Sequence, residues 1–199
     1  MSFWMWLLAA LVAVIVVAGG GLGWMVWRLN QETVGPVAVT NAGGKAGTAL
    51  LVYQPGLTDF PKAVADAYGD GLVANGWEVA STTVSVQTPA DLTPYDLVVL
   101  AAPVYAGAAA KPLTRYVARV GDFHGKAVVV LLAGAGDVDQ AVADATATVK
   151  AAKGRPVEAF GVTSMKPNDE ANRYTGSNTE RARAIVRDAA RDVTAAMAG

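Results

Sequence analysis

The sequence predicts an α/β protein whose five-stranded parallel sheet is doubly wound and is preceded by one N-terminal transmembrane helix. An uncharged apolar run opens the chain, and short apolar segments then alternate with helical patterns. Segments that are apolar throughout are typical of strands buried on both faces of a parallel sheet. Their alternation with helices indicates crossover connections, which wind helices onto both faces of such a sheet.

Composition excludes several kinds of site. The 199 residues include no cysteine, so disulfides, cysteine-ligated zinc and iron–sulfur clusters are excluded. The single histidine, His124, leaves no multi-histidine metal site. The 16 Lys and Arg residues balance 17 Asp and Glu residues, and no basic stripe is present. This balance argues against a nucleic acid as the main partner.

The apolar run at the start of the chain is predicted to be a membrane anchor. Residues 3–27 carry no charge and would form a helix about 37 Å long, enough to cross a hydrocarbon core of about 30 Å. Tryptophans lie near both ends, as in the aromatic belts of membrane helices: Trp4, Trp6, Trp24 and Trp27. We expect residues 1–27 to be an uncleaved anchor. A cleaved signal peptide is the alternative, but the run is long and lacks a positive n-region.

Charge and glycine spacing suggest how this anchor is placed. Arg28 follows the span directly, which favours a single-pass protein of the cell membrane with a cytoplasmic C-terminal domain. Gly19 and Gly23 form a small-xxx-small pair, which predicts close packing against a second transmembrane helix or self-association. Alternatively, these glycines reflect only the high frequency of glycine in membrane helices.

The rest of the chain divides into a linker and one domain. Residues 28–47 are rich in Gly, Pro, Asn and Thr and show no sustained period, which predicts a linker. Residues 48–199 form a segment of ordinary single-domain length. The domain opens with a short apolar run at 48–53, a buried strand. A helix is then predicted over 61–75, because apolar residues recur every four positions: Phe60, Val64, Tyr68 and Leu72.

The remaining elements follow the same alternation. The segment 77–84 has the period of two of a second strand, and further strands are predicted at 95–101, 126–132 and 156–162. Between them, a helix begins at Pro112 and an alanine-rich helix spans 137–153. Ser177 and Glu180 have the spacing of a capping box, which opens the last helix.

The loops after the first, third and fourth domain strands are the candidate ligand loops. In doubly wound sheets, ligands bind beyond the carboxyl ends of the strands, near the switch in strand order. The segment 95–107 (Tyr-Asp-Leu-Val-Val-Leu-Ala-Ala-Pro-Val-Tyr-Ala-Gly) resembles the third-strand segment of flavodoxin-like proteins, in which an aspartate opens the strand and a Pro-Val-Tyr-Ala-Gly-type turn closes it. A Lys-Pro pair then starts the next helix, as Lys111 and Pro112 do. The resemblance covers residues 48–195.

This resemblance implies an FMN site without catalytic side chains. The phosphate would lie on the first loop, at Gln54, Pro55, Gly56, Leu57, Thr58 and Asp59. The second loop would flank the flavin ring with Pro103, Val104, Tyr105, Ala106 and Gly107. The third loop would close the other side with Gly134, Ala135, Gly136 and Asp137.

The first loop departs from the pattern of the family. Only Gly56 and Thr58 remain of the usual interleaved glycine and hydroxyl residues, and Asp59 would place a carboxylate near a phosphate dianion. Lys62, in the first helical turn, would offset that charge. Alternatively, Thr58 or Asp59 merely caps the helix, and Tyr105 is merely half-buried packing at a strand end.

Three functions remain open. The first is a membrane-tethered FMN-binding electron-transfer protein of the flavodoxin type, with a redox protein or a quinone as partner. The second is an FMN-dependent quinone or protoporphyrinogen oxidoreductase. The third is an accessory or scaffold subunit of a membrane complex that has lost FMN. A long polar loop at 165–178 would contact a partner or substrate, or be only a solvated connection.

Overall fold

The structure is a computed structural model that describes residues 3–29, 31–166, 168 and 175–198. The chain divides into two compact units, residues 1–31 and residues 32–199. The first unit is helix α1 (Phe3–Leu29). By length and composition, α1 is the one helix of the described residues that is long and apolar enough to cross a membrane.

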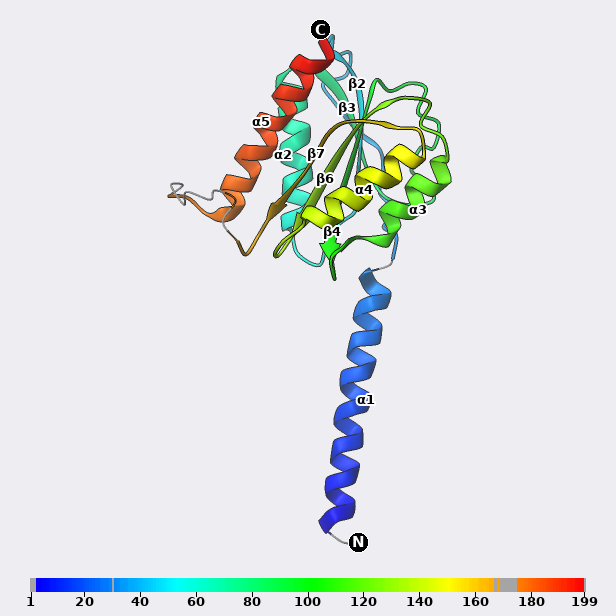
Figure 1. The fold of residues 1–199 in the computed structure, drawn as a ribbon, viewed down its shortest axis with the longest axis vertical. Helices are drawn as coiled ribbons and strands as arrows, with labels where there is room; N and C mark the ends of the chain where they lie inside the picture. The colour runs from blue at the N-terminus through cyan, green and yellow to red at the C-terminus, as the bar shows by residue number, and fades with distance from the viewer. Residues whose placement is uncertain (1–2, 30, 167, 169–174, 199) are drawn as a thin grey trace. The chain divides into compact units, whose positions relative to one another are not determined.

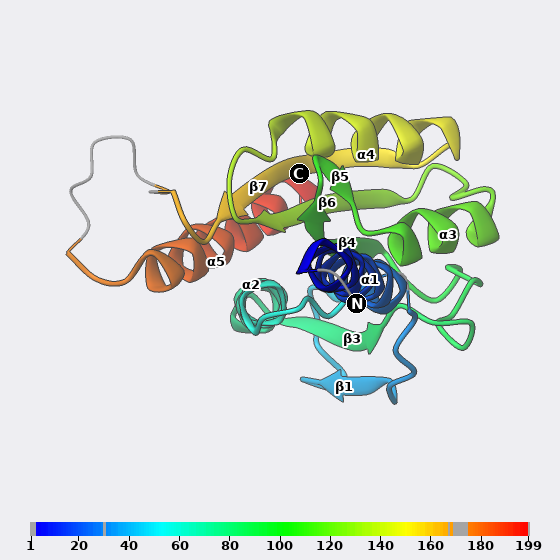
Figure 2. The same ribbon diagram turned by 90° about the horizontal axis from the view of Figure 1, so that it is seen from below.

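The second unit is built on a sheet with helices on both faces (Figures 1 and 2). Five parallel strands are arranged in the order β3-β2-β4-β6-β7, and β1 pairs antiparallel with the outer edge of β3. Their bounds are β1 (Ala38–Thr40), β2 (Gly47–Tyr53), β3 (Trp77–Thr83), β4 (Leu97–Tyr105), β6 (Ala127–Gly134) and β7 (Arg155–Thr163). The two-residue strand β5 (Ala108–Ala109) pairs antiparallel with the end of β4.

The helices form two layers around this sheet. Figure 2 shows α3 (Lys111–Val120) and α4 (Asp139–Ala151) on one face, and α2 (Phe60–Ala74) and α5 (Asn178–Ala198) on the other. Successive residues of β2 serve the two cores in turn: Leu51 packs in the cluster under α2 and α5, and Leu50 in the cluster under α3 and α4. This alternation follows from the period of two of a strand. It explains why the strands are apolar throughout.

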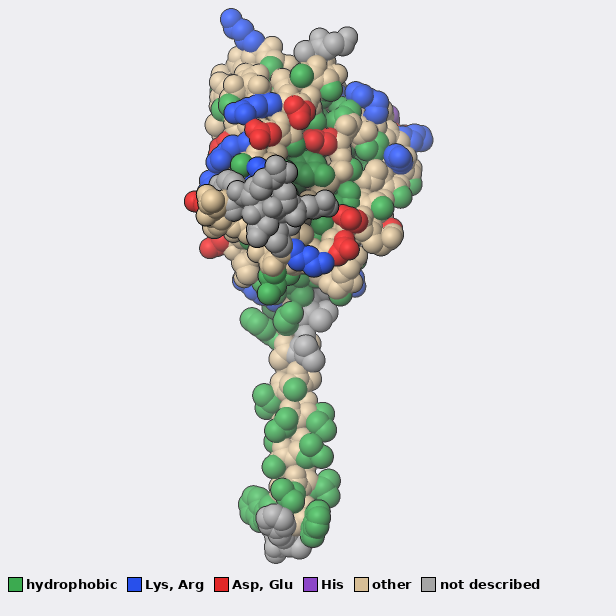
Figure 3. All heavy atoms as spheres, turned by 60° about the vertical axis from the view of Figure 1, so that its left-hand side comes forward, with side chains coloured by type: hydrophobic (Ala, Val, Ile, Leu, Met, Phe, Trp, Pro, Cys, Tyr) green, Lys and Arg blue, Asp and Glu red, His purple; other side chains and the backbone are tan. Residues whose placement is uncertain are grey.

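The predicted fold class is confirmed, and each predicted strand and helix of the domain is present with slightly different bounds. The capping box is also present: the Ser177 N–H donates to Glu180 (3.0 Å), and the Glu180 N–H donates to Ser177 Oγ (3.1 Å). This capping box opens α5, on whose exposed side Arg side chains are interspersed with Asp and Glu side chains (Figure 3). Arg191 there pairs with Asp188 at 2.9 Å.

The structure differs from the prediction between residues 28 and 47. Part of the expected linker is strand β1, in which Val39 pairs with Ala80 of β3. The second unit begins at Glu32, well before residue 48. A strand of three residues is too short to show the alternation of apolar and polar residues by which strands are recognised. Its pairing also depends on the neighbouring edge of β3, which the local sequence does not reveal.

The crossover from β3 to β4 is a loop rather than a helix. Arg119 of α3 holds it by donating to the carbonyl oxygens of Ser85 (2.7 Å) and Thr88 (2.8 Å). The hydroxyl of the buried Tyr116 donates to the carbonyl of Pro89 at 2.7 Å. The guanidinium carbon of Arg119 also lies 5.3 Å from the centre of the Tyr116 ring. These contacts replace the packing that a crossover helix would supply.

Candidate cofactor site

The carboxyl ends of β2, β4 and β6 bring the candidate loops to one edge of the sheet. These strands are neighbours in the order β2-β4-β6, so their following loops also lie side by side. The chain leaves β2 through α2 on one face and leaves β4 through α3 on the other. The strand order therefore switches between β2 and β4, which is where doubly wound sheets place a ligand.

The first loop presents unoccupied backbone donors. Asp59 is the N-cap residue of α2, but its side chain makes no capping hydrogen bond. Among the described residues, the backbone N–H groups of Gly56, Thr58, Asp59 and Phe60 donate to no protein acceptor. The alternative that Thr58 or Asp59 merely caps the helix is therefore not supported by the geometry. Free N–H groups at the positive end of a helix form an anion site.

Tyr105 joins the first and second loops. The Leu57 N–H donates to the Tyr105 hydroxyl oxygen at 2.8 Å. The ring is half-buried, and burial raises the pKa of Tyr105, so the hydroxyl stays protonated at neutral pH. The sequence predicts that this side chain faces a flavin. The structure also gives it a role that the sequence did not suggest, because it occupies one donor of the first loop and fixes the two loops together.

The second loop is a tight hairpin between β4 and β5. Tyr105 pairs with Ala108, and the two central residues, Ala106 and Gly107, have φ angles of 50° and 79°. Positive φ at both positions is typical of a type I′ turn. Pro103 is buried and Val104 is half-buried, whereas the two turn residues are exposed. The hairpin thus places a small exposed tip over the edge of the sheet.

The glycines of the third loop have different roles. A Cβ atom at Gly134 would overlap Val138 Cγ1, so this glycine is required by the packing of α4. A Cβ atom at Gly136 would meet nothing within 4 Å. Ala135 is exposed, and its carbonyl accepts a hydrogen bond from the Met165 N–H at 3.2 Å. The part of this loop that is open to a ligand comprises the exposed Ala135 and Asp137 and the half-buried Gly136 between them.

Two other residues named by the sequence analysis, Gln54 and Lys62, have roles that the sequence did not specify. Gln54 is only 5% exposed, and its backbone N–H donates to Ala101, so it supports the first loop from below. The ammonium of Lys62 donates to Asp66 at 2.6 Å and lies 6.0 Å from the centre of the Tyr53 ring. The negative charge of Asp59 acts on Lys62 as well, but Asp66 is its main partner. The hydrogen bond to Asp66 raises the pKa of Lys62. The spacing of four residues on one helix was a sequence signal for this pair.

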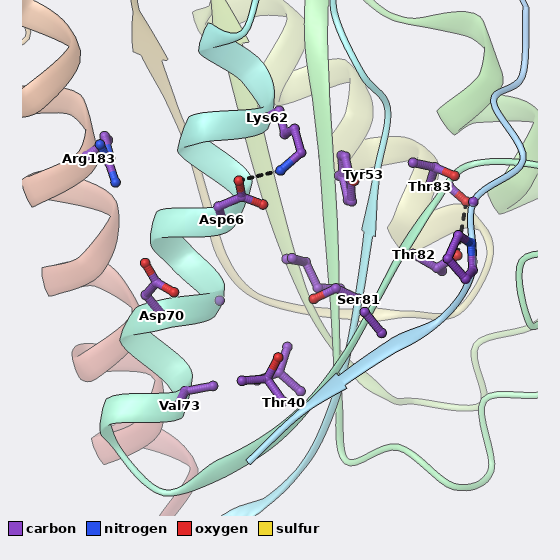
Figure 4. Close-up of a pocket in the computed structure, with 16 residues that line it drawn as sticks. Thr40, Tyr53, Lys62, Asp66, Asp70, Val73, Ser81, Thr82, Thr83 and Arg183 are labelled. Atoms are coloured by element: carbon purple, nitrogen blue, oxygen red, sulfur yellow. Dashed lines mark hydrogen bonds and ion pairs between the residues drawn. The ribbon is translucent and has the colours of Figure 1, made fainter. Parts of the chain in front are cut away.

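Lys62 also borders a groove that the sequence did not predict. The groove has a volume of about 570 Å³ and lies between α2 and the strands β1 and β3. Figure 4 shows Lys62, Asp66 and Asp70 along α2. Thr40 and Ser81 contribute the opposite wall of the groove. Because that wall includes β1, the groove exists only where the expected linker has become a strand.

Side-chain hydrogen bonds hold the described parts of the long polar loop after β7 against the end of that strand. The Asn168 side chain donates to the Thr163 carbonyl and accepts from the Thr163 N–H, both at 2.7 Å. The Asn178 side-chain amide donates to the carbonyls of Thr163 (2.7 Å) and Lys166 (2.6 Å). The rest of the predicted 165–178 loop, residues 167 and 169–174, lies outside the described residues. His124 lies at the amino edge, opposite the site, and is exposed.

The arrangement fits a phosphorylated ligand with a flat ring. The free N–H groups of the first loop and the Thr58 hydroxyl can bind a phosphate, as the end of α2 favours negative charge. The hydroxyl of Tyr105 accepts from Leu57 and keeps its own proton to donate. Its ring and the hairpin provide the apolar side of the same edge. No side chain needs to act as an acid or a base in such a site.

Comparisons with solved structures identify the fold. The flavodoxin of Streptococcus pneumoniae TIGR4 shares 16% identity over 73% of this chain and 99% of its own, with a TM-score of 0.53. The flavodoxin of Megasphaera elsdenii shares 16% over 70% of this chain and 98% of its own, with a TM-score of 0.53. The chain has a flavodoxin-like fold.

A further flavodoxin-like structure is an enzyme. The NAD(P)H:quinone oxidoreductase of Methanothermobacter marburgensis shares 16% identity over 73% of this chain and 96% of its own, with a TM-score of 0.50. No protein-family model and no curated protein matches the sequence. At these identities the likeness establishes the fold alone.

Proposed function

We propose that this protein is a membrane-anchored electron-transfer protein of the flavodoxin type that binds FMN at the carboxyl edge of its sheet. The observation that carries the proposal is the uncapped start of α2 at the switch in strand order, where N–H groups of the first loop have no protein acceptor. The flavodoxin-like fold supports the same placement, and α1 supports the anchor.

Each loop has a defined task in this proposal. Bound FMN would supply the redox chemistry. The first loop holds the phosphate through backbone N–H groups and Thr58. Tyr105 ties the first loop to the hairpin, so the two sides of the site keep a fixed separation. The hairpin and the exposed part of the third loop exclude water from the ring and orient it, which is the usual share of the protein in cofactor chemistry.

The test compares FMN with riboflavin, which lacks the phosphate. We expect Thr58→Ala to weaken FMN binding by about 10- to 100-fold, the equivalent of one hydrogen bond to a charged group, and to leave riboflavin binding unchanged. Thr114→Ala removes an exposed threonine of α3, outside the loops, and serves as the matched control. Equal affinity of the wild-type chain for FMN and riboflavin would contradict the proposed phosphate site.

A second candidate is the accessory subunit that has lost FMN. It is favoured by one observation: the Leu57 N–H already donates to the Tyr105 hydroxyl, so it is not free to donate to a phosphate oxygen. A protein that takes up neither flavin, even after Tyr105→Phe frees that donor, would support this candidate. An FMN-bound protein that turns over a quinone with a reductant would instead be an oxidoreductase, as the solved quinone oxidoreductase suggests.

A further inference from the structure

The groove between α2 and the strands β1 and β3 takes no part in the proposed cofactor site. Its volume of about 570 Å³ lies in the range of small-ligand pockets. No residue of the three candidate loops lines it, and all of its lining residues belong to the second unit. Its floor includes Leu51 of β2 and Val79 of β3, which are both almost fully buried. The groove is therefore an independent candidate site with an apolar floor.

Three hydroxyl groups on the strand side of the groove are available to a ligand. They belong to Tyr53 of β2, Ser81 of β3 and Thr40 of β1 (Figure 4). The strand register places them on the same face of the sheet as Leu51 and Val79. Within the described part of the chain, none of the three hydroxyls has a hydrogen-bond partner. Each can both donate and accept, so this wall suits a ligand that does the same.

The charges along the groove balance one another. On α2, Lys62 forms an ion pair with Asp66 at 2.6 Å, and Asp70 lies 3.9 Å from Arg187 of α5. Arg183 of α5 also lines the groove. The lining side chains thus carry two positive and two negative charges. An anionic ligand would meet the two carboxylates and a cationic ligand the two cations, so the groove favours a ligand without net charge.

Gly69 leaves the floor of the groove accessible. Glycine is the least favourable helix residue after proline, and α2 contains glycine at positions 69 and 71. A Cβ atom at Gly71 would lie 2.7 Å from Ala190 Cβ, so packing against α5 requires that glycine. At Gly69 a Cβ atom would make only ordinary contacts, at 3.6 Å from Leu51 Cδ2 and 4.0 Å from Val79 Cγ1. Packing does not explain Gly69, whose missing side chain leaves space above the floor.

We propose that this groove binds a neutral sugar, with the hydroxyl groups of the sugar on the two walls and its C–H face on the floor. Sugar hydroxyls donate to Asp66 and Asp70, which can only accept, and exchange hydrogen bonds with the hydroxyls of the strand wall. The C–H face of the ring packs on Leu51 and Val79. The proposal depends neither on the cofactor nor on the anchor.

The test compares sugars that share one ring and differ in charge. D-glucose, D-galactose and D-mannose are each compared with their 2-amino and uronic acid derivatives, at a mildly acidic pH that keeps the amine protonated. Binding to the full-length protein, in a detergent without a sugar head group, is measured by saturation-transfer difference NMR. We expect at least one neutral hexose to bind, and both of its charged derivatives to bind several-fold more weakly. Binding of none of the three hexoses, or tighter binding of a charged derivative, would overturn the proposal.

Two variants that lose no protein contact locate the binding in the groove. Gly69→Ala places a methyl group over the floor without a clash, so it should weaken binding several-fold and leave thermal stability unchanged or higher. Ser81→Ala should weaken binding by about 3- to 10-fold, the equivalent of one neutral hydrogen bond. Thr148→Ala removes an exposed threonine of α4 and is the control. Wild-type affinity in both groove variants would contradict the proposal, whereas FMN uptake should be the same in all four proteins.

Discussion

Glu158 shows how a single half-buried carboxyl group makes the stability of this domain depend on pH. It lies on β7, where the hydroxyl of the fully buried Tyr68 donates to it at 3.1 Å. Burial raises the pKa of Glu158 from its ordinary value of 4.5 to about 7, and the negative charge of Asp192 acts in the same direction. Between these two pH values the folded state binds more protons than the unfolded state.

Stability should therefore fall as the pH rises from about 4.5 to about 7. Because the carboxyl is partly exposed, solvent screening reduces the effect of this group to about 1 kcal/mol. Glu158→Gln should remove this contribution. The check is urea denaturation of both proteins at pH 5 and pH 8, where the difference between the two proteins isolates Glu158. An identical pH dependence of the two proteins would show that Glu158 titrates normally.

Two glycines of one loop make a second prediction at the scale of residues. A Cβ atom at Gly134 would overlap Val138 Cγ1, whereas one at Gly136 would lie in open space. We expect Gly134→Ala to lower the free energy of unfolding by about 1–3 kcal/mol through overpacking. Gly136→Ala should change it by less than about 0.5 kcal/mol. Chemical denaturation of the two variants measures both values, and equal losses would be incompatible with this packing.

At the scale of elements, the loop that replaces a crossover helix depends on α3. The two carbonyl oxygens that accept from Arg119 belong to the buried residues Ser85 and Thr88. We expect Arg119→Ala to lower the free energy of unfolding by about 2 kcal/mol, because charge-assisted hydrogen bonds to buried carbonyls are lost. Arg191→Ala, which removes an exposed ion pair with Asp188, is the control and should cost less than about 0.5 kcal/mol. Similar melting curves for the two variants would refute the role assigned to Arg119.

The hairpin between β4 and β5 is a second element whose geometry can be tested. Ala106 adopts a φ angle of 50°, which is unfavourable for alanine, at a position where type I′ turns prefer asparagine. We expect Ala106→Asn to raise the free energy of unfolding by about 0.5–1 kcal/mol. Thermal denaturation in the absence of flavin tests this, and a lower melting temperature would argue against the turn type.

At the scale of the whole molecule, the sequence predicts the elements better than the contacts between them. The central strands were recognisable because they are apolar throughout, and α2 because its apolar residues recur every four positions. Strand β1 was missed because three residues carry no period. The Tyr105–Leu57 hydrogen bond joins residues 48 positions apart, and no local pattern specifies such a pair.

For the candidate site, too, the sequence predicts positions better than contacts. The order of strands and helices predicts where the loops lie, and the family resemblance predicts their ligand. Which backbone N–H groups of the loops remain without a partner cannot be predicted, because it depends on which side chains reach the loop in three dimensions. Lys62 is the clearest case: the structure gives it a hydrogen bond to Asp66 as well as the expected interaction with the charge of Asp59.

The most direct test of the central claim is whether the full-length protein keeps FMN. The detergent-purified protein is incubated with FMN, passed through gel filtration and examined by visible absorption spectroscopy. We predict that the two visible bands of oxidised flavin elute with the protein at a ratio close to one flavin per chain. A colourless protein peak after this treatment would contradict the account and leave the flavodoxin-like fold without its cofactor.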